Sequence, residues 1–198
     1  IFFSEFNYDK PCAQREILVS NAFNPEGNPN GQFAERFRSA MASLWAQYRK
    51  VCSLSPKART GDCRPTIGLL VDPNHYEETH LAFLYADLLK PLGWQTLIVG
   101  GQNLQVKNDR VEAFGQPLDI LLRQFPTEFS HEIQAYPAIL RLFAQGKVLL
   151  LNDPRAIIPQ AKSLFAYLWE LYEHSSSSLS EAEKKTISET IPYTRLFD

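Results

Sequence analysis

Residues 65–125 decide the fold, and they read PTIGLLVDPNHYEETHLAFLYADLLKPLGWQTLIVGGQNLQVKNDRVEAFGQPLDILLRQF. Three runs in this stretch, at 66–72, 94–99 and 118–125, are short, apolar and bounded by Pro, Gly and Asp. Such runs are typical of strands that are buried on both faces of a parallel sheet. The segment 75–92 carries apolar residues at helical spacing, which predicts a crossover helix. We therefore expect an α/β fold with a mostly parallel, Rossmann-like sheet covered by helices.

The C-terminal side continues this pattern. We expect a hairpin at 104–114, a helix from Pro137 to Gly146 and a buried strand at 147–151, giving a sheet of roughly four or five strands. Further helices are expected at 160–173, after a loop, and before Pro192, where Ser180 and Glu183 form a capping box.

The N-terminal side contains a predicted strand at 1–9, a short helix at 12–19, a loop at 20–30 and a long helix at 31–51. The apolar stripe of the long helix needs a partner surface, and it comprises Phe33, Phe37, Ala40, Met41, Leu44, Tyr48 and Val51. The predicted domains are an N-terminal strand and helices at 1–52, a linker at 53–65, a sheet domain at 66–174, and a connector and helix at 175–198.

Composition narrows the classes of partner. The chain has 198 residues, a net charge of -2 and no basic run, which argues against a nucleic-acid partner. No apolar run is long enough to span a bilayer, so no membrane partner is expected. Cys12, Cys52 and Cys63 form no Cys-x-x-Cys pair, which favours neither a disulfide framework nor a thiolate zinc site. These features predict a cytoplasmic protein.

Ligands of open α/β sheets gather at the carboxyl ends of the strands. The strand at 118–125 delivers Arg123 and, shortly after it, Glu128 to that edge. Arg123 is a candidate for gripping a substrate carboxylate or phosphate, and Glu128 a candidate for receiving an amine. The alternative is an internal Arg-Glu pair that fixes the loop.

Two other polar groups are candidates for binding. Glu5, Asn7 and Asp9 lie on one face of the N-terminal strand, and their oxygen atoms suit Mg²⁺, although spacing alone favours a solvent-facing strand side. Lys162 flanks an apolar helical face and is a candidate for binding a phosphate or carboxylate, against the alternative of a solvated lysine. His75 and His80 are five residues apart, which places them on different helix faces and argues against a zinc pair.

The ordered set of these segments resembles the glutathionylspermidine synthase family and its relatives, the circularly permuted ATP-grasp carboxylate-amine ligases. The resemblance is carried by Glu5-Phe6-Asn7-Tyr8-Asp9 with Pro11, by the strand Asp119–Glu128, and by Lys162 through Leu168-Trp169-Glu170-Leu171. It spans nearly the whole chain, and the shared order of the segments carries it rather than any single motif.

The resemblance implies a ligase that phosphorylates a carboxylate with ATP and lets an amine attack the acyl phosphate. Glu5 and Asn7 would then hold Mg²⁺, with Glu5 also at the ATP, while Asp9 and Glu128 would lie near the small-molecule substrates. Mg²⁺ would neutralise charge on the transferring phosphoryl group. Residues 66–174 would form the pre-ATP-grasp domain.

Departures from the family pattern leave the acid, the amine and the oligomeric state open. Lys10 stands where the family has Ser or Thr, Thr127 where it often has Trp, and Ala161 where it has Asn. We expect the chain to be a piece of a longer ligase and to be inactive by itself. The alternatives are a non-enzymatic α/β module that binds a small anion or a protein, and a degenerate ligase domain.

Overall fold

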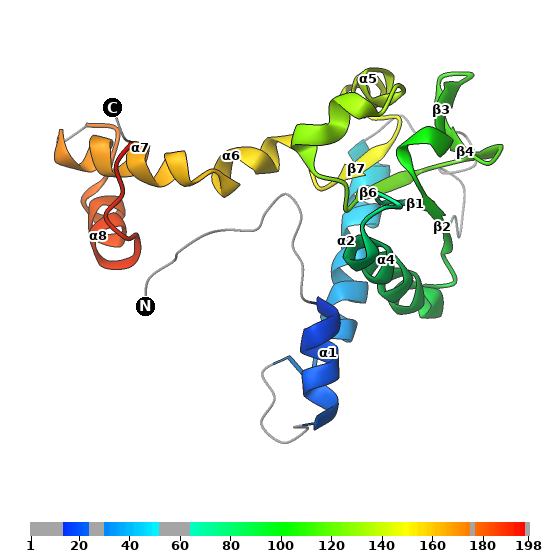
Figure 1. The fold of residues 1–198 in the computed structure, drawn as a ribbon, viewed down its shortest axis with the longest axis horizontal. Coiled ribbons are helices and arrows are strands. Elements are labelled where there is room, and N and C mark those ends of the chain that lie inside the picture. Colours follow the sequence, from blue (N-terminus) through cyan, green and yellow to red (C-terminus); the bar gives the residue numbers. More distant parts are fainter. Residues whose placement is uncertain (1–13, 24–29, 52–63, 175–176, 197–198) are drawn as a thin grey trace. The chain divides into compact units, whose positions relative to one another are not determined.

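The computed structural model describes residues 14–23, 30–51, 64–174 and 177–196. Contacts divide the chain into a larger unit, residues 10–152, and a smaller unit made of residues 1–9 and 153–198. Figure 1 shows the elements of both units, which are described separately below.

The larger unit contains a four-stranded parallel sheet in the order β2-β1-β6-β7. Its strands are β1 (Thr66–Leu70), β2 (Gln95–Val99), β6 (Ile120–Arg123) and β7 (Leu149–Leu151). β1 pairs with both β2 and β6, in a register that aligns Leu69 with Ile98 and with Leu122. The predicted α/β fold with a Rossmann-like parallel sheet is thereby confirmed.

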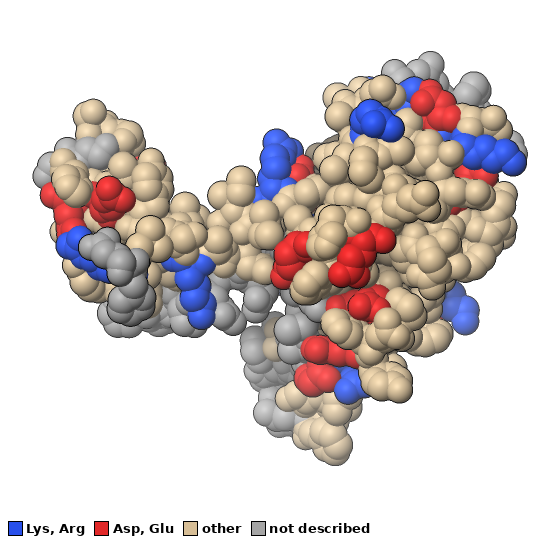
Figure 2. All heavy atoms as spheres, turned by 45° about the horizontal axis from the view of Figure 1, so that its top comes forward, with Lys and Arg blue, Asp and Glu red and all other residues tan. Residues whose placement is uncertain are grey.

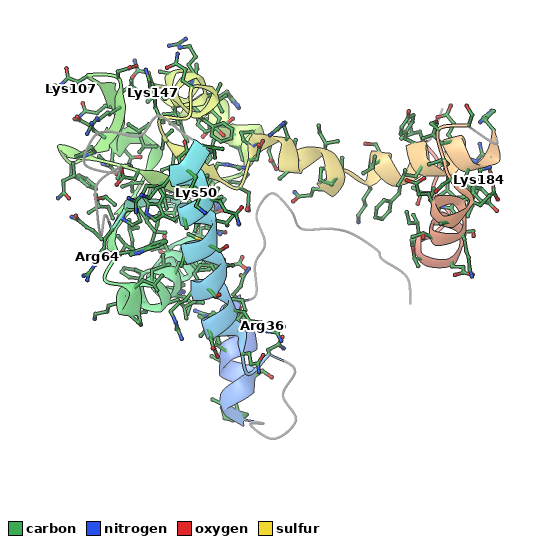
Figure 3. All side chains as sticks on the ribbon, turned by 180° about the vertical axis from the view of Figure 1, so that it is seen from behind. Arg36, Lys50, Arg64, Lys107, Lys147 and Lys184 are labelled. Carbon is green, nitrogen blue, oxygen red and sulfur yellow. The ribbon has the colours of Figure 1, made fainter. Side chains whose placement is uncertain are left out.

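Helices cover one face of this sheet. They are α2 (Phe33–Val51) and α4 (Tyr76–Leu89), and α4 is followed by the 3-10 helix η1 (Lys90–Leu92). α1 (Gln14–Phe23) contacts α4. One apolar core joins Met41 and Trp45 of α2 to α4 and to Leu69 and Leu122 of the sheet. Figure 3, seen from behind, shows α2 lying across this face between Arg36 and Lys50. The partner surface of the long helix is therefore the sheet together with α4.

The opposite face packs against α5 (Tyr136–Ala144) and a small antiparallel sheet of β3 (Leu104–Lys107), β4 (Arg110–Ala113) and β5 (Gln116–Pro117). A second core joins Ile139 and Leu142 of α5 to Leu70, Leu121 and Leu150 of the parallel sheet. The turn between β3 and β4 consists of Asn108 and Asp109, which have φ values of 48° and 63°. Positive φ at both positions matches the twist of a tight hairpin.

The smaller unit holds η4 (Pro154–Ala156), α6 (Ile157–Gln160), α7 (Lys162–Glu173) and α8 (Glu181–Thr190). Phe165 of α7 forms a buried cluster with Ile187 and Ile191. The predicted capping box is confirmed: the Glu183 backbone N–H donates to Ser180 Oγ at 3.3 Å, and the Ser180 backbone N–H donates to the Glu183 carboxylate at 2.8 Å. These hydrogen bonds satisfy backbone donors at the start of α8.

Several predicted boundaries are wrong in detail. α1 continues through the expected loop start to Phe23, and residues 154–160, expected as mostly loop, contain η4 and α6. On α2, Trp45 is buried although it was not placed on the apolar stripe, whereas Val51 is 83% exposed. The packing of α2 against α4 and the sheet, rather than hydrophobicity alone, decides which of these side chains is covered. The predicted strand at 1–9 and most of the predicted linker lie outside the described residues.

Asp119 precedes β6 and is an acidic side chain whose pKa is changed by its position in the sheet. Its carboxylate accepts a hydrogen bond from the Thr66 backbone N–H at 2.9 Å. Burial raises the pKa of Asp119, and the Thr66 hydrogen bond and the charge of Arg110 oppose this rise without cancelling it. The folded state therefore holds the Asp119 proton more tightly than the unfolded state does, so its contribution to stability decreases as pH rises through the raised pKa.

We expect Asp119→Asn to gain stability relative to the unmodified chain as pH rises from about 3.9, the ordinary pKa of an aspartate, through the raised pKa of Asp119, because the variant lacks this titration. Its amide oxygen still accepts from Thr66, so the hydrogen bond itself is preserved. Urea unfolding of both proteins across this range measures the difference in the free energy of unfolding. A difference that stays constant, or shrinks as pH rises, would contradict the prediction.

Candidate functional site

A cleft of about 630 Å³ lies at the carboxyl edge of the parallel sheet. Its lining follows three strands and η3 (Thr127–Glu132), and comprises Asp72, Pro73, Asn74, Gly101, Gln102, Leu104, Phe125, Glu132, Ile133 and Gln134. We call it the acidic cleft. The sequence placed Asp72, Gly101 and Phe125 at strand ends, and the structure brings these three ends together.

The strand order explains why the cleft lies here. The chain leaves β1 toward β2 on one side, then returns past β1 to β6 on the other side. Loops that diverge in opposite directions leave a crevice at the carboxyl ends of the two central strands, where ligands of open α/β sheets bind. The acidic cleft occupies this switch point.

A hydrogen-bonded loop fixes Asp72 after β1. Its carboxylate accepts from the backbone N–H of Asn74 at 2.9 Å and from the side-chain amide of Asn74 at 3.1 Å. The Asp72 backbone N–H in turn donates to Glu78, which is only 2% exposed and also lies 3.1 Å from Nδ1 of His75. The buried Glu78 carboxylate thus links the loop to the first turn of α4, and the position of the Asp72 charge is set by these bonds.

The opposite wall depends on a close approach between two segments. A Cβ atom at Gly101 would lie 2.6 Å from Cγ1 of Ile133, which is closer than side chains pack. Glycine at this position therefore lets the segment after β2 lie against the end of η3. This contact brings Gln102 and Glu132 to the same cleft.

The cleft carries negative charge. Its lining includes the carboxylates of Asp72 and Glu132 and the carboxamides of Asn74, Gln102 and Gln134, and no Lys, Arg or His among the described residues lines it. Figure 2 shows Asp and Glu side chains gathered on the face of the larger unit that is turned toward the viewer. Carboxylates in a concave surface raise the local concentration of cations, and carboxamides add hydrogen-bond donors and acceptors. This arrangement suits a ligand with an ammonium group.

Arg123, the candidate for gripping a substrate anion, is fully buried at the end of β6. Its Nη1 donates to the Phe125 carbonyl at 2.6 Å, and its Nη2 donates to the Asn152 carbonyl at 3.3 Å. Phe125 lines the acidic cleft, and these two hydrogen bonds connect its segment to the end of β7. They give Arg123 a positioning role, and its predicted contact with substrate stays a prediction.

Glu128 and Lys162 are both exposed. Glu128 lies in the first turn of η3, whereas Glu132, at the end of the same 3-10 helix, lines the acidic cleft. Lys162 begins α7 in the smaller unit. His75 and His80 have separate partners, since His75 lies beside Glu78 and His80 lies 2.9 Å from Nη1 of Arg15.

Glu5, Asn7 and Asp9 lie outside the described residues, so their predicted roles stay predictions. Within the described ranges, no group of three or more His, Cys, Asp or Glu side chains is placed to hold a metal ion. In the same ranges, no helix combines the length and apolarity that crossing a bilayer requires. Sequence reasoning missed Glu132 as a cleft residue, although an acidic side chain at the end of the segment after β6 was visible in the sequence.

No family model matches the chain. Among curated proteins, the chain is similar to the formate–tetrahydrofolate ligase of Bacillus pumilus, with 26% identity over 144 residues that cover 66% of this chain and 26% of that protein. The chain thus spans about a quarter of the length of this relative. The similarity to this protein is distant, and the likeness to the glutathionylspermidine synthase family stays a prediction.

We expect Arg123→Met to lower the free energy of unfolding by about 3 kcal/mol, because it removes donors from two carbonyls in a buried environment. Arg141→Met is the matched control, since Arg141 is exposed on α5 and its replacement is expected to cost less than about 0.5 kcal/mol. Urea unfolding followed by circular dichroism measures both values. Equal effects of the two substitutions would contradict the positioning role.

Proposed function

We propose that the chain is part of an ATP-dependent ligase that joins a carboxylate to an amine, and that the acidic cleft binds the amine. The observation that carries this proposal is the pair of carboxylates, Asp72 and Glu132, at the switch point of the sheet, with no basic side chain among the cleft's described lining. Such a surface attracts an ammonium group and repels phosphate. The distant similarity to a ligase and the resemblance of the segment order support the reaction class.

The reaction would proceed in two steps, phosphorylation of the carboxylate and attack by the amine. A carboxylate oxygen attacks the γ-phosphorus of ATP and displaces ADP, forming an acyl phosphate. The ammonium group first gives a proton to solvent water, and the neutral amine then attacks the acyl carbon. Inorganic phosphate leaves, and the nitrogen loses a second proton to solvent to form the amide. Mg²⁺ supplies charge neutralisation on the phosphoryl group.

The residues proposed for ATP and Mg²⁺ are carried over from the resemblance. Glu5 and Asn7 offer the carboxylate and amide oxygens that Mg²⁺ prefers, and Asp9 follows them in the sequence. We place Glu128 near the substrates on the basis of the resemblance, and Lys162 at a phosphate or carboxylate on the basis of its position beside an apolar helical face. We propose that the cleft positions the amine, while Glu78 and Arg123 hold the cleft loops through their hydrogen bonds.

The amine subsite is testable on the chain itself. We expect a linear diamine such as putrescine to bind, and the neutral diol of the same length to bind more weakly, because only the diamine gains from the carboxylates. Glu132→Gln and Asp72→Asn should each weaken diamine binding about five- to tenfold, and added salt should weaken it further. Isothermal titration calorimetry measures the dissociation constants.

Asp87→Asn is the control for this experiment. Asp87 is exposed in the last turns of α4, and its replacement removes the same unit of charge outside the lining of the cleft. We expect this variant to bind the diamine like the unmodified chain. Equal weakening by all three substitutions would show a diffuse charge effect and would overturn the amine subsite.

Turnover is testable in the polypeptide that contains this chain together with the rest of the ligase. We expect ADP release only when ATP, Mg²⁺, a carboxylate and an amine are all present, measured by a coupled assay over panels of acids and amines. Glu132→Gln should raise the KM for the amine about five- to tenfold with kcat nearly unchanged, whereas Glu5→Gln should lower kcat. Diamine binding without any ADP release would refute the ligase and leave a cation-binding module.

A further inference from the structure

A second pocket, of about 270 Å³, lies on the α2 face of the sheet, and we call it the α2 pocket. Its wall is mainly apolar and includes Phe33 and Phe37 of α2, Tyr85 of α4, Leu122 of β6 and Leu151 of β7. Figure 3 shows α2 lying across this face of the larger unit. The acidic cleft belongs to other residues, so the two pockets share no lining side chain.

The carboxamide residues Gln14, Gln124 and Asn152 also line the α2 pocket, and the side-chain oxygens of the two glutamines have unused hydrogen-bonding capacity among the described residues. Gln124 is only 2% exposed, and its Nε2 donates to the Tyr85 hydroxyl at 3.4 Å. Its Oε1, and the Oε1 of Gln14 in α1, are buried and accept no hydrogen bond within the described part of the chain. A buried acceptor without a donor is unfavourable, and a donor brought by a ligand would remove that penalty.

The aromatic side chains give the pocket a flat wall. The rings of Phe37 and Tyr85 stack with their centroids 5.1 Å apart and an angle of 11° between their planes, and Phe33 stacks on Phe37 at 6.1 Å. No Lys, Arg, His, Asp or Glu is among the described residues that line the pocket. A charged ligand would therefore lose its hydration without gaining a counter-ion, whereas an apolar ring would be favoured.

We infer that the α2 pocket is a binding site for a small, uncharged aromatic molecule that carries an N–H donor. The ring packs beside Phe33, Phe37 and Leu122, and the N–H group donates to Oε1 of Gln124. The pocket is larger than a cavity of about 150 Å³ that binds benzene, so a one- or two-ring ligand fits. This site is distinct from the proposed amine subsite, because none of its residues lines the acidic cleft.

A pair of isosteric probes tests the assignment on the unmodified chain. Indole and benzofuran have the same shape, but indole carries an N–H group where benzofuran has an oxygen. We expect indole to bind about five- to tenfold more tightly, which corresponds to one hydrogen bond. Binding is measured by titration calorimetry and by ligand-observed nuclear magnetic resonance. Equal binding of the two probes, tighter binding of benzofuran, or no binding of either probe would overturn the inference.

Three variants locate the site. Gln124→Met should reduce indole binding to the level of benzofuran, because it removes the acceptor. It also removes the 3.4 Å hydrogen bond from Gln124 Nε2 to the Tyr85 hydroxyl, so its free energy of unfolding is measured alongside. Gln47→Met is the matched control, since Gln47 is exposed on α2 and bonds only to Ser43 among the described contacts, so it should leave indole binding unchanged.

Ala40→Leu, at an exposed position in the pocket lining, should weaken the binding of both probes by filling the space. If Gln124→Met fails to fold, the Ala40 variant and the probe pair still decide: indole binding that Ala40→Leu leaves unchanged would refute the site.

Discussion

Burial of β1 and β6 on both faces is the constraint on which the larger unit depends. Ile67, Leu69, Leu70, Ile120 and Leu121 are each 0% exposed, so both strands must be covered by separate layers. Because side chains alternate along a strand, Leu69 and Leu122 enter the core under α2 and α4, while Leu70 and Leu121 enter the core under α5 and the hairpin. The same alternation continues past the hydrogen-bonded end of β6, where Gln124 lines the α2 pocket and Phe125 lines the acidic cleft.

Most of the fold was predictable because its signals are local. The apolar runs of β1, β2 and β6, the α4 stripe and the Ser180–Glu183 capping box each depend on spacing within one segment, and the structure confirms all of them. The misassigned side chains of α2 have a different cause. Trp45 and Val51 are both apolar, and only the position of the sheet beneath α2 buries one and exposes the other.

The candidate site was less accessible to sequence reasoning, because it is made by loops that meet only in three dimensions. The strand ends were expected at one edge, and they do meet there. Glu132 depends on where η3 ends, and Gln124 matters because its carboxamide is enclosed by α2, α4 and the sheet. Neither residue is part of a sequence motif whose spacing would have predicted that it lines a pocket. The sequence left two roles open for Arg123, binding a substrate anion or fixing the loop. Its burial and its hydrogen bonds to the Phe125 and Asn152 carbonyls favour the role in fixing the loop.

The end of β6 connects the two pockets through consecutive residues. Gln124 lines the α2 pocket, Phe125 lines the acidic cleft, and Arg123 bonds the Phe125 carbonyl. The Gln124 backbone N–H also donates to the Leu70 carbonyl at 2.8 Å, so this segment remains attached to β1 and cannot shift at one residue alone. A ligand that moved Gln124 would therefore change the position of Phe125, and any resulting change in affinity would have to act equally in both directions. Arg123 holds this segment in place, and this restraint sets the size of the coupling between the two pockets. A segment with one stable position transmits little change in affinity from one pocket to the other, whereas a segment with two stable positions transmits more.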